Sequence, residues 1–336
     1  MVENNNFYIE KIECIVFIGY SDVFEDLLTI NTKLNIPTKI ISSTDQSTDL
    51  KLDHIVFDNI DSNFYDYIQN NFNIKNTLFI SLGSRLIFNS KVISFLNGNL
   101  VNFHGSRLPY DSGGGGFSWR IMRQDRINNQ LVHLIDEGID TGPIIDNELS
   151  IFPKNCILPI DFEKYRLKKF LVFYRNFISK NLTGTQFNLK HQVDYLGRYN
   201  PRLSTIDNGY INWDWDPLEL YNFINSFDEP YSGSMSLLNR GDFGTIHLKS
   251  VHLHGGDSSN HPYMSGLVSR HDKKWIVVST SGKYSLLIEE VLDSNGKNII
   301  DKIKPGDRFY TPRELLDKSL SKRVFFNSKG KNIYLK

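Results

Sequence analysis

The first hundred residues alternate short apolar runs with amphipathic segments, and this alternation limits the folds that the chain can adopt. Four runs are short and apolar enough to be buried strands: Ile12–Gly19, Ile36–Ile41, His54–Phe57 and Thr77–Ser81. Between them, residues 21–33 and 64–72 repeat apolar side chains at the helical period. Strands that alternate with helices predict a mostly parallel sheet with helices on both faces, so we expect a Rossmann-like α/β fold.

Gly19 ends the first of these strands, but no further glycines follow at the spacing of a dinucleotide-binding turn. That G-x-G-x-x-G turn lets the backbone approach a pyrophosphate at a helix N-terminus. Its absence leaves a nicotinamide oxidoreductase as a weak alternative. In open α/β sheets ligands bind at the carboxyl ends of the strands, which is where the functional residues are expected.

The chain has 336 residues, which is enough for two domains with separate cores. After about residue 230 the pattern changes to short alternating runs separated by Gly, Asn and Asp, which is typical of a small barrel or sandwich. We therefore predict a catalytic domain over residues 1–200, a linker with a helix over 201–230, and a smaller β-rich, OB-like barrel domain over 231–336.

Two helices can be placed by their own signals. Asp161–Leu182 is amphipathic over its whole length, and its aromatic stripe is expected to be core. A second helix is expected to start at Asp216-Pro217, because Asp is a good N-cap and Pro fits the first helical position.

Charge and cysteine content narrow the partners and the compartment. The 38 Lys and Arg residues equal the 38 Asp and Glu residues, so no global basic field attracts nucleic acid. Cys14 and Cys156 match no metal spacing and favour a reduced protein, although one disulfide stays open. Met1–Asn6 resembles no signal peptide, and no apolar run is long enough to span a bilayer. We expect a soluble cytoplasmic protein.

The densest cluster of reactive side chains lies between Leu100 and Gly142. Asn102 and His104 are alternate residues of an expected strand, so their side chains share one face. Asn102 is an amide donor, and His104 titrates near neutral pH. Asp140 lies in a glycine-bounded loop and can orient the imidazole. Each residue alone is usually structural, but the combination of donor, base and carboxylate favours catalysis.

The run Asn102-x-His104-x-Ser106, followed by Leu108-Pro109, a glycine-rich turn and Asp136–Gly142, resembles the folate-dependent formyltransferases. That family includes methionyl-tRNA formyltransferase, glycinamide ribonucleotide transformylase and the nucleotide-sugar N-formyltransferases. The resemblance implies transfer of formyl from 10-formyltetrahydrofolate to an amine, with catalytic roles for Asn102, His104 and Asp140 and no metal. It also implies the pterin contacts, which would be Gly83, Leu86, Ile87, Ile135, Asp136, Gly138 and Ile139.

Two departures from the family pattern bear on the acceptor amine. Members that act on tRNA usually carry a long basic insertion where Ser42–Leu50 has two acids and no base, and phosphates are hard to hold without Lys or Arg. Arg107 stands where the family usually has Leu, and four glycines follow at 113–116. A cation beside an open backbone suits a diphosphate, so we predict substrate contacts at Arg107, Gly113 and Gly114.

The predicted acceptor is therefore a nucleotide-linked amino sugar, such as a dTDP-4-amino-4,6-dideoxyhexose, destined for a surface polysaccharide such as lipopolysaccharide O-antigen. Methionyl-tRNA formyltransferase is the alternative within the family, and a non-catalytic binding protein is the alternative outside it. A homodimer is expected by analogy with the sugar enzymes. Arg107 is equally consistent with an ion-paired surface residue.

Two further groups of side chains are compatible with base stacking and with metal binding, but we favour structural roles for both. Trp213, Trp215 and Tyr231 can stack a base, but core packing is the better interpretation. His252 and His254 share a strand face, but no Cys or carboxylate cluster accompanies them at ligand spacing.

Overall fold

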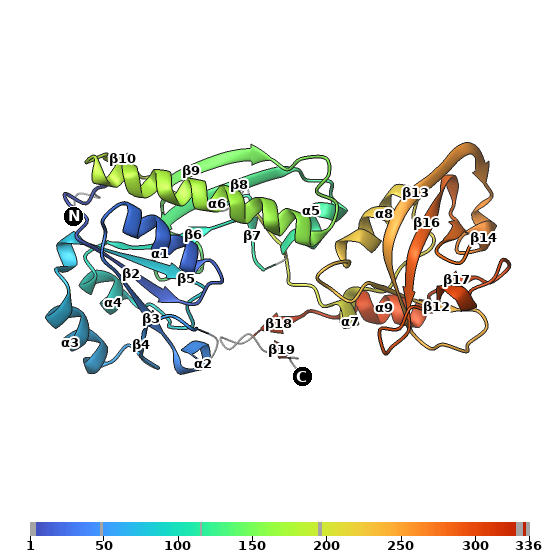
Figure 1. Ribbon diagram of the computed structural model, residues 1–336, viewed down its shortest axis with the longest axis horizontal. Helices are drawn as coiled ribbons and strands as arrows, with labels where there is room; N and C mark the ends of the chain where they lie inside the picture. The colour runs from blue at the N-terminus through green and yellow to red at the C-terminus, as the bar shows by residue number, and fades with distance from the viewer. Residues whose placement is uncertain (1–4, 48–49, 115, 194–196, 327–331, 334–336) are drawn as a thin grey trace.

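The computed structural model describes residues 5–47, 50–114, 116–193, 197–326 and 332–333. Figure 1 shows an α/β body formed by the N-terminal part of the chain beside a β-rich body formed by the C-terminal part. The first contains a seven-stranded sheet and the second a six-stranded antiparallel sheet that forms a half-barrel. The predicted fold class is confirmed.

The N-terminal sheet has the strand order β4-β3-β2-β5-β6-β8-β9. Its strands are β2 (Cys14–Gly19), β3 (Thr38–Ser42), β4 (Ile55–Val56), β5 (Thr77–Leu82), β6 (Leu100–His104), β8 (Ile127–Leu134) and β9 (Ile144–Ile151). The first five in spatial order run parallel, while β8 and β9 are antiparallel to their neighbours. The sheet is therefore mostly parallel, as predicted, with an antiparallel edge.

Alternate side chains of β2 enter two separate cores. Ile15 and Phe17 pack with α1 and α6, whereas Val16 and Ile18 pack with α3 and α4. Helices therefore cover both faces of the sheet, as Figure 1 shows. The helices of this part are α1 (Phe24–Lys33), α2 (Thr44–Ser47), α3 (Ser62–Asn71), α4 (Ser90–Phe95), α5 (Gly116–Met122) and α6 (Pro159–Leu182).

The C-terminal sheet has the order β14-β15-β16-β13-β12-β17. Its elements are β12 (Ser234–Leu238), β13 (Ile246–Asn260), β14 (Val268–His271), β15 (Ile276–Ser279), β16 (Gly282–Leu292), β17 (Phe309–Tyr310), α8 (Pro217–Ser226) and α9 (Arg313–Ser321). Asp216 caps α8 as predicted, because its carboxylate accepts from the backbone N–H groups of Leu218 and Glu219. Trp213 is core, since its ring is buried, stacks on Phe309 and donates to Ser236.

Short elements complete the described chain. They are β1 (Asn6–Phe7), β7 (Asp111–Ser112), β10 (Phe187–Asn188), β11 (Arg198–Tyr199), β18 (Phe325–Phe326), β19 (Asn332–Ile333), α7 (Thr205–Asn208) and the 3-10 turns at Ile74–Asn76, Pro262–Met264 and Ile300–Lys302. Strands β7 and β11 form a parallel pair that joins segments distant in sequence. No helix within the described ranges combines the length and apolar character needed to cross a membrane.

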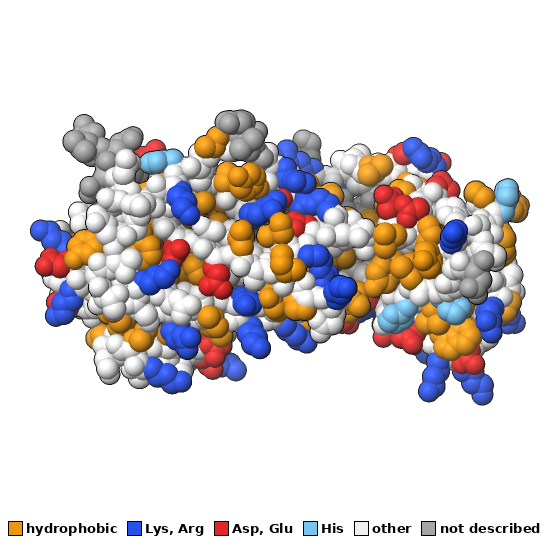
Figure 2. All heavy atoms as spheres, turned by 90° about the horizontal axis from the view of Figure 1, so that it is seen from above, with side chains coloured by type: hydrophobic (Ala, Val, Ile, Leu, Met, Phe, Trp, Pro, Cys, Tyr) orange, Lys and Arg blue, Asp and Glu red, His pale blue; other side chains and the backbone are white. Residues whose placement is uncertain are grey.

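The face in Figure 2 carries Lys and Arg side chains interspersed with acidic and apolar ones. This mixture fits the even charge balance of the sequence. In the C-terminal body α8 shares one core with β13 and β16, so the helix expected in the linker packs with the strands that follow it. The domain limits at residues 200 and 230 stay predictions.

Candidate active site

Asn102 and His104 come from β6, and Asp140 comes from the turn between β8 and β9. The structure brings the three side chains together. Asp140 Oδ1 lies 3.7 Å from His104 Nδ1 and 3.5 Å from Asn102 Nδ2. Asp140 has a positive φ of 59°, and the side chain of Gln192 donates to its carbonyl oxygen and to that of Gly142. The segment that contains Gln192 therefore holds in place the turn that carries the Asp140 carboxylate.

The turn also depends on Gly142. A side chain there would overlap the carbonyl oxygen of Leu134 at the end of β8. Glycine therefore allows the chain to fold back closely after Asp140 and to begin β9 beside β8.

The three side chains line a cavity of ≈ 450 Å³ at the carboxyl ends of β5 and β6. Its lining includes all seven residues predicted to contact a pterin: Gly83, Leu86, Ile87, Ile135, Asp136, Gly138 and Ile139. The volume falls within the usual range of small-molecule sites, about 300–1,000 Å³. The contacts themselves stay predictions.

His133 belongs to the same cluster and was missed by the sequence reasoning. It is the direct partner of Asn102 in the β6–β8 pair, and it is 2% exposed. Its Nε2 lies 3.1 Å from Asn102 Nδ2 and 3.7 Å from Asp140 Oδ1. The only sequence signal was its place among apolar residues directly before the Asp136–Gly142 motif.

The hydrogen bonds of His133 fix its role. Its Nδ1 lies 2.7 Å from the carbonyl oxygen of Leu134, so we assign the proton to this nitrogen. In the neutral tautomer Nε2 then accepts from the Asn102 amide. His133 thereby determines which way the amide nitrogen of Asn102 points.

Burial and neighbouring charges set the protonation of His104. Burial lowers the pKa of His104, and the opposing attraction of Asp140 does not outweigh it. The imidazole is therefore neutral at pH 7, and its Nδ1 faces the carboxylate. Its Nε2 is buried without a hydrogen-bond partner among the described residues. An unpartnered nitrogen of this kind can accept a proton.

Asp140 is held in its charged form. Burial alone raises the pKa of its carboxyl, but the neighbouring His133 and His104 reverse the shift and lower the pKa overall. A carboxylate beside Nδ1 of His104 favours the tautomer whose free lone pair is on Nε2.

The predicted substrate contacts lie outside this cavity lining. Arg107 pairs with Asp111, with Nε and Oδ2 3.7 Å apart, and its guanidinium lies over the Tyr110 ring. Gly113 and Gly114 pack against residues 199–202. Arg107 is thus ion-paired within the protein, and the substrate role of all three residues stays a prediction.

The acidic segment after β3 forms α2, and Thr48 and Asp49 lie outside the described residues. Asp45 lies 3.4 Å from Arg85, and the Gln46 amide donates to the carbonyl oxygen of Gly83 beside the cavity. This segment therefore supports the cavity wall.

Two histidines of the C-terminal sheet each contact a different group. His252 Nε2 lies 3.5 Å from Glu289, and His247 Nδ1 lies 3.0 Å from the Gly233 carbonyl oxygen. Within the described ranges, no three His, Cys, Asp or Glu side chains converge as metal ligands would. Cys14 and Cys156 are both free thiols.

Parts of the chain resemble known formyltransferases in sequence. The family described as formyl transferase, C-terminal domain, matches residues 204–302. Methionyl-tRNA formyltransferase from Clostridium perfringens (strain 13 / Type A) is 25% identical over 202 residues, which cover 59% of this chain and 61% of the relative. The corresponding enzyme from Thermodesulfovibrio yellowstonii is 25% identical over 60% of each chain. The chain thus matches less than two thirds of the length of these curated relatives.

Solved structures share the fold at lower identity. The N-formyltransferase from Helicobacter canadensis, solved with folinic acid and dTDP-3-aminofucose, has a TM-score of 0.60 at 16% identity and covers 83% of this chain and 99% of its own. A 4-N formyltransferase from Francisella tularensis has a TM-score of 0.54 at 18% identity, covering 70% and 98%. The chain thus resembles the formyl transferase family in its C-terminal domain and in the sequence of curated relatives, and it shares its fold with solved N-formyltransferases.

Proposed function

We propose that the protein transfers a formyl group from 10-formyltetrahydrofolate to the amine of a nucleotide-linked amino sugar. The observation that carries this proposal is the convergence of Asn102, His104 and Asp140 on one cavity. The unpartnered Nε2 of His104 and the volume of the cavity fit a reacting amine and a bound pterin. The cosubstrate, when bound, supplies the formyl carbon.

Each side chain has a distinct task in this reaction. The attacking amine must lose a proton, and the neutral Nε2 of His104 can accept it, which typically contributes about 100- to 10,000-fold in rate. Asp140 orients the imidazole and stabilises it once it is protonated. The proton held by the imidazole can then pass to N10 of the folate as the bond between N10 and the formyl carbon breaks, which releases tetrahydrofolate. The Asn102 amide donates to the formyl oxygen as negative charge develops there, and losing such a donor costs about 100- to 1,000-fold.

The contacts of Asn102 are compatible with that task. Its hydrogen bond to Asp140 is long, at 3.5 Å, whereas the one to His133 is 3.1 Å. One N–H can therefore be redirected to the formyl oxygen while His133 keeps the other in place.

Support for a sugar acceptor comes from two sources. The segment at α2 is short and carries Asp45 in place of a basic insertion, so it has no Lys or Arg that could bind tRNA phosphates. The Helicobacter canadensis relative was solved with a dTDP-amino sugar and folinic acid. The product would be a formamido sugar for a surface polysaccharide, made in the cytoplasm, and a homodimer is part of this proposal.

Methionyl-tRNA formyltransferase is the second candidate, because the curated relatives at 25% identity carry that activity. The deciding experiment measures release of tetrahydrofolate from 10-formyltetrahydrofolate with a panel of amino-sugar nucleotides and with charged initiator tRNA. We expect turnover with at least one amino-sugar nucleotide and none with the tRNA. Turnover with the tRNA alone would contradict the sugar proposal and leave a formyltransferase.

A further inference from the structure

Two features outside the lining of the catalytic cavity have no role in the proposed mechanism. One is a group of three arginines, Arg107, Arg123 and Arg198, around Asp111. The other is an aromatic pocket of ≈ 630 Å³ between α5 and the C-terminal body. We propose that together they hold the nucleotide of the acceptor, with its diphosphate on the arginine group and its base in the aromatic pocket. This inference rests on the proposed function.

The arginine group carries more positive charge than its carboxylate neutralises. Asp111 lies 3.3 Å from Arg123 Nη2, 3.5 Å from Arg198 Nε and 3.7 Å from Arg107 Nε. Its side chain is only 5% exposed, whereas the three arginines are 26%, 58% and 26% exposed in that order. One carboxylate for three guanidinium groups leaves two positive charges with access to solvent.

The hydrogen bonding of this group is also incomplete. Asp111 Oδ2 and Arg107 Nε are both buried, and at 3.7 Å they form an ion pair without a hydrogen bond. Buried Arg120 also interacts with Asp111, and nearby Asp125 offsets its charge. Guanidinium groups bind phosphate oxygens through paired N–H donors, so a diphosphate matches both the charge and the donors of the group.

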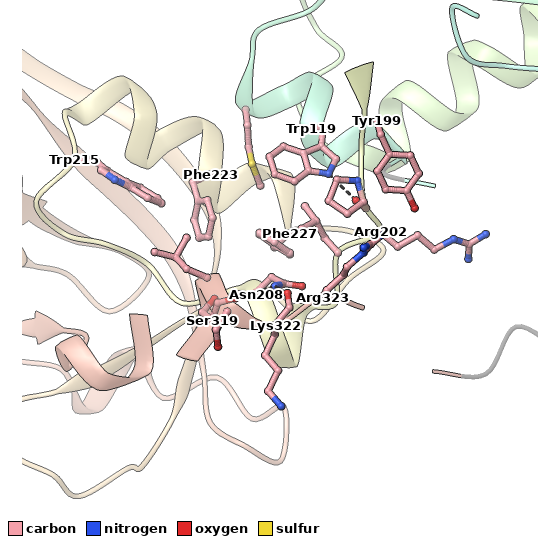
Figure 3. Close-up of a pocket in the computed structure, with 15 residues that line it drawn as sticks. Trp119, Tyr199, Arg202, Asn208, Trp215, Phe223, Phe227, Ser319, Lys322 and Arg323 are labelled. Atoms are coloured by element: carbon pink, nitrogen blue, oxygen red, sulfur yellow. Dashed lines mark hydrogen bonds between the residues drawn. The ribbon is translucent and has the colours of Figure 1, made fainter. Parts of the chain in front are cut away.

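The aromatic pocket is suited to a planar ring. Figure 3 shows Trp119 and Tyr199 on the side of the N-terminal body and Trp215, Phe223 and Phe227 on the side of the C-terminal body. Nucleobases stack on aromatic side chains with little dependence on sequence. Arg202, Lys322 and Arg323 also line the pocket.

The two features share their supporting elements. Trp119 and Arg123 are one helical turn apart at the end of α5, where Trp119 Nε1 donates to the carbonyl oxygen of Pro201 over 2.8 Å. Arg123 Nη1 donates to the Asn200 side-chain oxygen over 2.7 Å. A ligand that touches the arginine group can therefore extend directly into the pocket.

The strand pair β7–β11 and the glycines after it bind the same segments together. Arg198 pairs with Asp111 and Tyr199 with Ser112 in register. A side chain at Gly113 or Gly114 would overlap the backbone of Asn200 or the side chain of Arg202. The glycine run thus allows the close approach of the segment that carries both the arginine group and the pocket wall.

The arginine group is also close to the reacting centre. Arg107 follows His104 by three residues, so at most about 11 Å of backbone separates them. A hexose can therefore present its amine to His104 while the diphosphate attached to it contacts Arg107.

The test measures binding of dTDP alone by titration calorimetry and by quenching of tryptophan fluorescence. We expect dTDP to bind the unaltered protein. Arg198→Ala should weaken binding about 10- to 100-fold through lost charged hydrogen bonds, and Tyr199→Ala about 5- to 100-fold through lost stacking. Both side chains are exposed, so both variants should fold.

Matched controls use exposed residues outside both features. Arg175→Ala on α6 removes an exposed arginine. Tyr263→Ala removes an exposed ring that lies under Arg308, as the ring of Tyr199 lies under Arg323. Both controls should bind dTDP within about twofold of the unaltered protein, which is within the scatter of surface substitutions.

The outcomes separate this inference from the proposed function. If an amino-sugar nucleotide is formylated but Arg198→Ala and Tyr199→Ala change neither dTDP affinity nor the acceptor KM, this inference is wrong and the function stands. If dTDP binds as expected but no amino-sugar nucleotide is formylated, the proposed function fails instead. Displacement of dTDP by charged initiator tRNA that is then formylated overturns the assignment of the pocket to a nucleotide sugar.

Discussion

Asn102 Nδ2 lies 3.1 Å from His133 Nε2, across the antiparallel pair of β6 and β8. Since His133 Nδ1 donates to the Leu134 carbonyl oxygen, its Nε2 can only accept in the neutral ring. The amide of Asn102 is therefore turned with its nitrogen toward Asp140 and the cavity. His133 is a positioning residue in this arrangement, because it acts on the reaction through Asn102.

Replacing His133 with Leu should lower kcat about 10- to 100-fold and leave the KM for the folate nearly unchanged. Without His133 the side-chain amide of Asn102 can rotate, and its N–H no longer points steadily at the formyl oxygen. A hydrogen bond to a charged group is worth about 1.5–3 kcal/mol, which sets the size of the expected loss. Steady-state kinetics with the best acceptor give both constants.

A double-mutant cycle distinguishes positioning from general damage. If His133 acts through Asn102, then adding His133→Leu to Asn102→Ala should cost much less than it costs alone. Fully additive losses would show that His133 affects activity by another route.

His104→Asn should reduce kcat about 100- to 10,000-fold, because it removes the only neutral base proposed at the reacting amine. Asp140→Asn should also reduce kcat, since an amide holds the imidazole less firmly and does not stabilise its charge. Binding of 5-formyltetrahydrofolate, measured by calorimetry, should persist in both variants. Asp26→Asn, at an exposed acid of α1, serves as the control. Full activity of His104→Asn would rule out the mechanism and leave an enzyme.

The pH response of His104 can be measured directly. Burial lowers the pKa of His104, so its Cε1–H resonance, assigned by its loss in His104→Asn, should titrate with a midpoint below 6.5. Asp140→Asn removes a neighbour that raises this pKa and should lower the midpoint further. A midpoint at or above 6.5 would contradict the neutral base.

The lowered pKa of His104 also makes the free energy of unfolding depend on pH. The unfolded chain protonates this histidine at about 6.5, whereas the folded protein does so only at lower pH. The free energy of unfolding therefore rises with pH between the folded value and 6.5, and falls on acidification through that range. His104→Asn should remove this part of the pH dependence in urea titrations.

The parallel strands could be predicted from the sequence because their burial on both faces requires continuous apolar runs. Thr77–Ser81 was predicted and Thr77–Leu82 is observed; Asp161–Leu182 was predicted and Pro159–Leu182 is observed. The strand–turn geometry also brought Asn102, His104 and Asp140 together as expected. These features depend on short-range pattern and on the side-chain period of a strand.

The antiparallel edge could not be predicted in the same way. In β8, Asn128, Asn129 and Gln130 are buried although their sequence resembles a polar loop. Their amide nitrogens donate to groups distant in sequence: Asn128 Nδ2 to Ser150 Oγ over 3.0 Å, and Asn129 Nδ2 to the Ser106 carbonyl oxygen over 3.3 Å. Because β8 was not predicted, the position of His133 opposite Asn102 could not be predicted either. The contact between Arg198 and Asp111 was missed for a separate reason, since it depends on the short β7–β11 pair.

Two exposed isoleucines at the catalytic cavity give a prediction about folate binding. Ile87 is 79% exposed and Ile139 is 90% exposed, and both line the cavity. A bound pterin that covers either side chain gains about 1 kcal/mol from roughly 40 Å² of buried apolar area. Ile87→Ser or Ile139→Ser should therefore raise the KM for 10-formyltetrahydrofolate about fivefold and change kcat by less than about twofold.

Ile206→Ser is the matched control, because Ile206 is 77% exposed on α7 and lines neither the catalytic cavity nor the aromatic pocket. It should leave both constants unchanged. An unchanged folate KM in both cavity variants would place the pterin elsewhere.

The hydroxyl of Tyr174 on α6 donates to Asn31 Oδ1 on α1 over 2.9 Å, and both side chains are fully buried. Tyr174→Phe leaves the Asn31 oxygen without its donor, so urea titration should show a loss of about 1–3 kcal/mol in the free energy of unfolding. Tyr165→Phe, at a half-buried position of the same helix, should cost less.

The pH dependence of this loss tests the burial of the phenol. Burial raises the pKa of Tyr174 well above its usual 10, so the hydroxyl stays protonated in the folded protein where the unfolded chain ionises. Its contribution to stability is therefore complete below pH 10 and declines as pH rises above that value. The difference between the unaltered protein and Tyr174→Phe should accordingly be constant from pH 7 to 9 and smaller at pH 10.5. A difference that grows with pH would mean that the phenol ionises more readily in the folded state, against the buried hydrogen bond to Asn31.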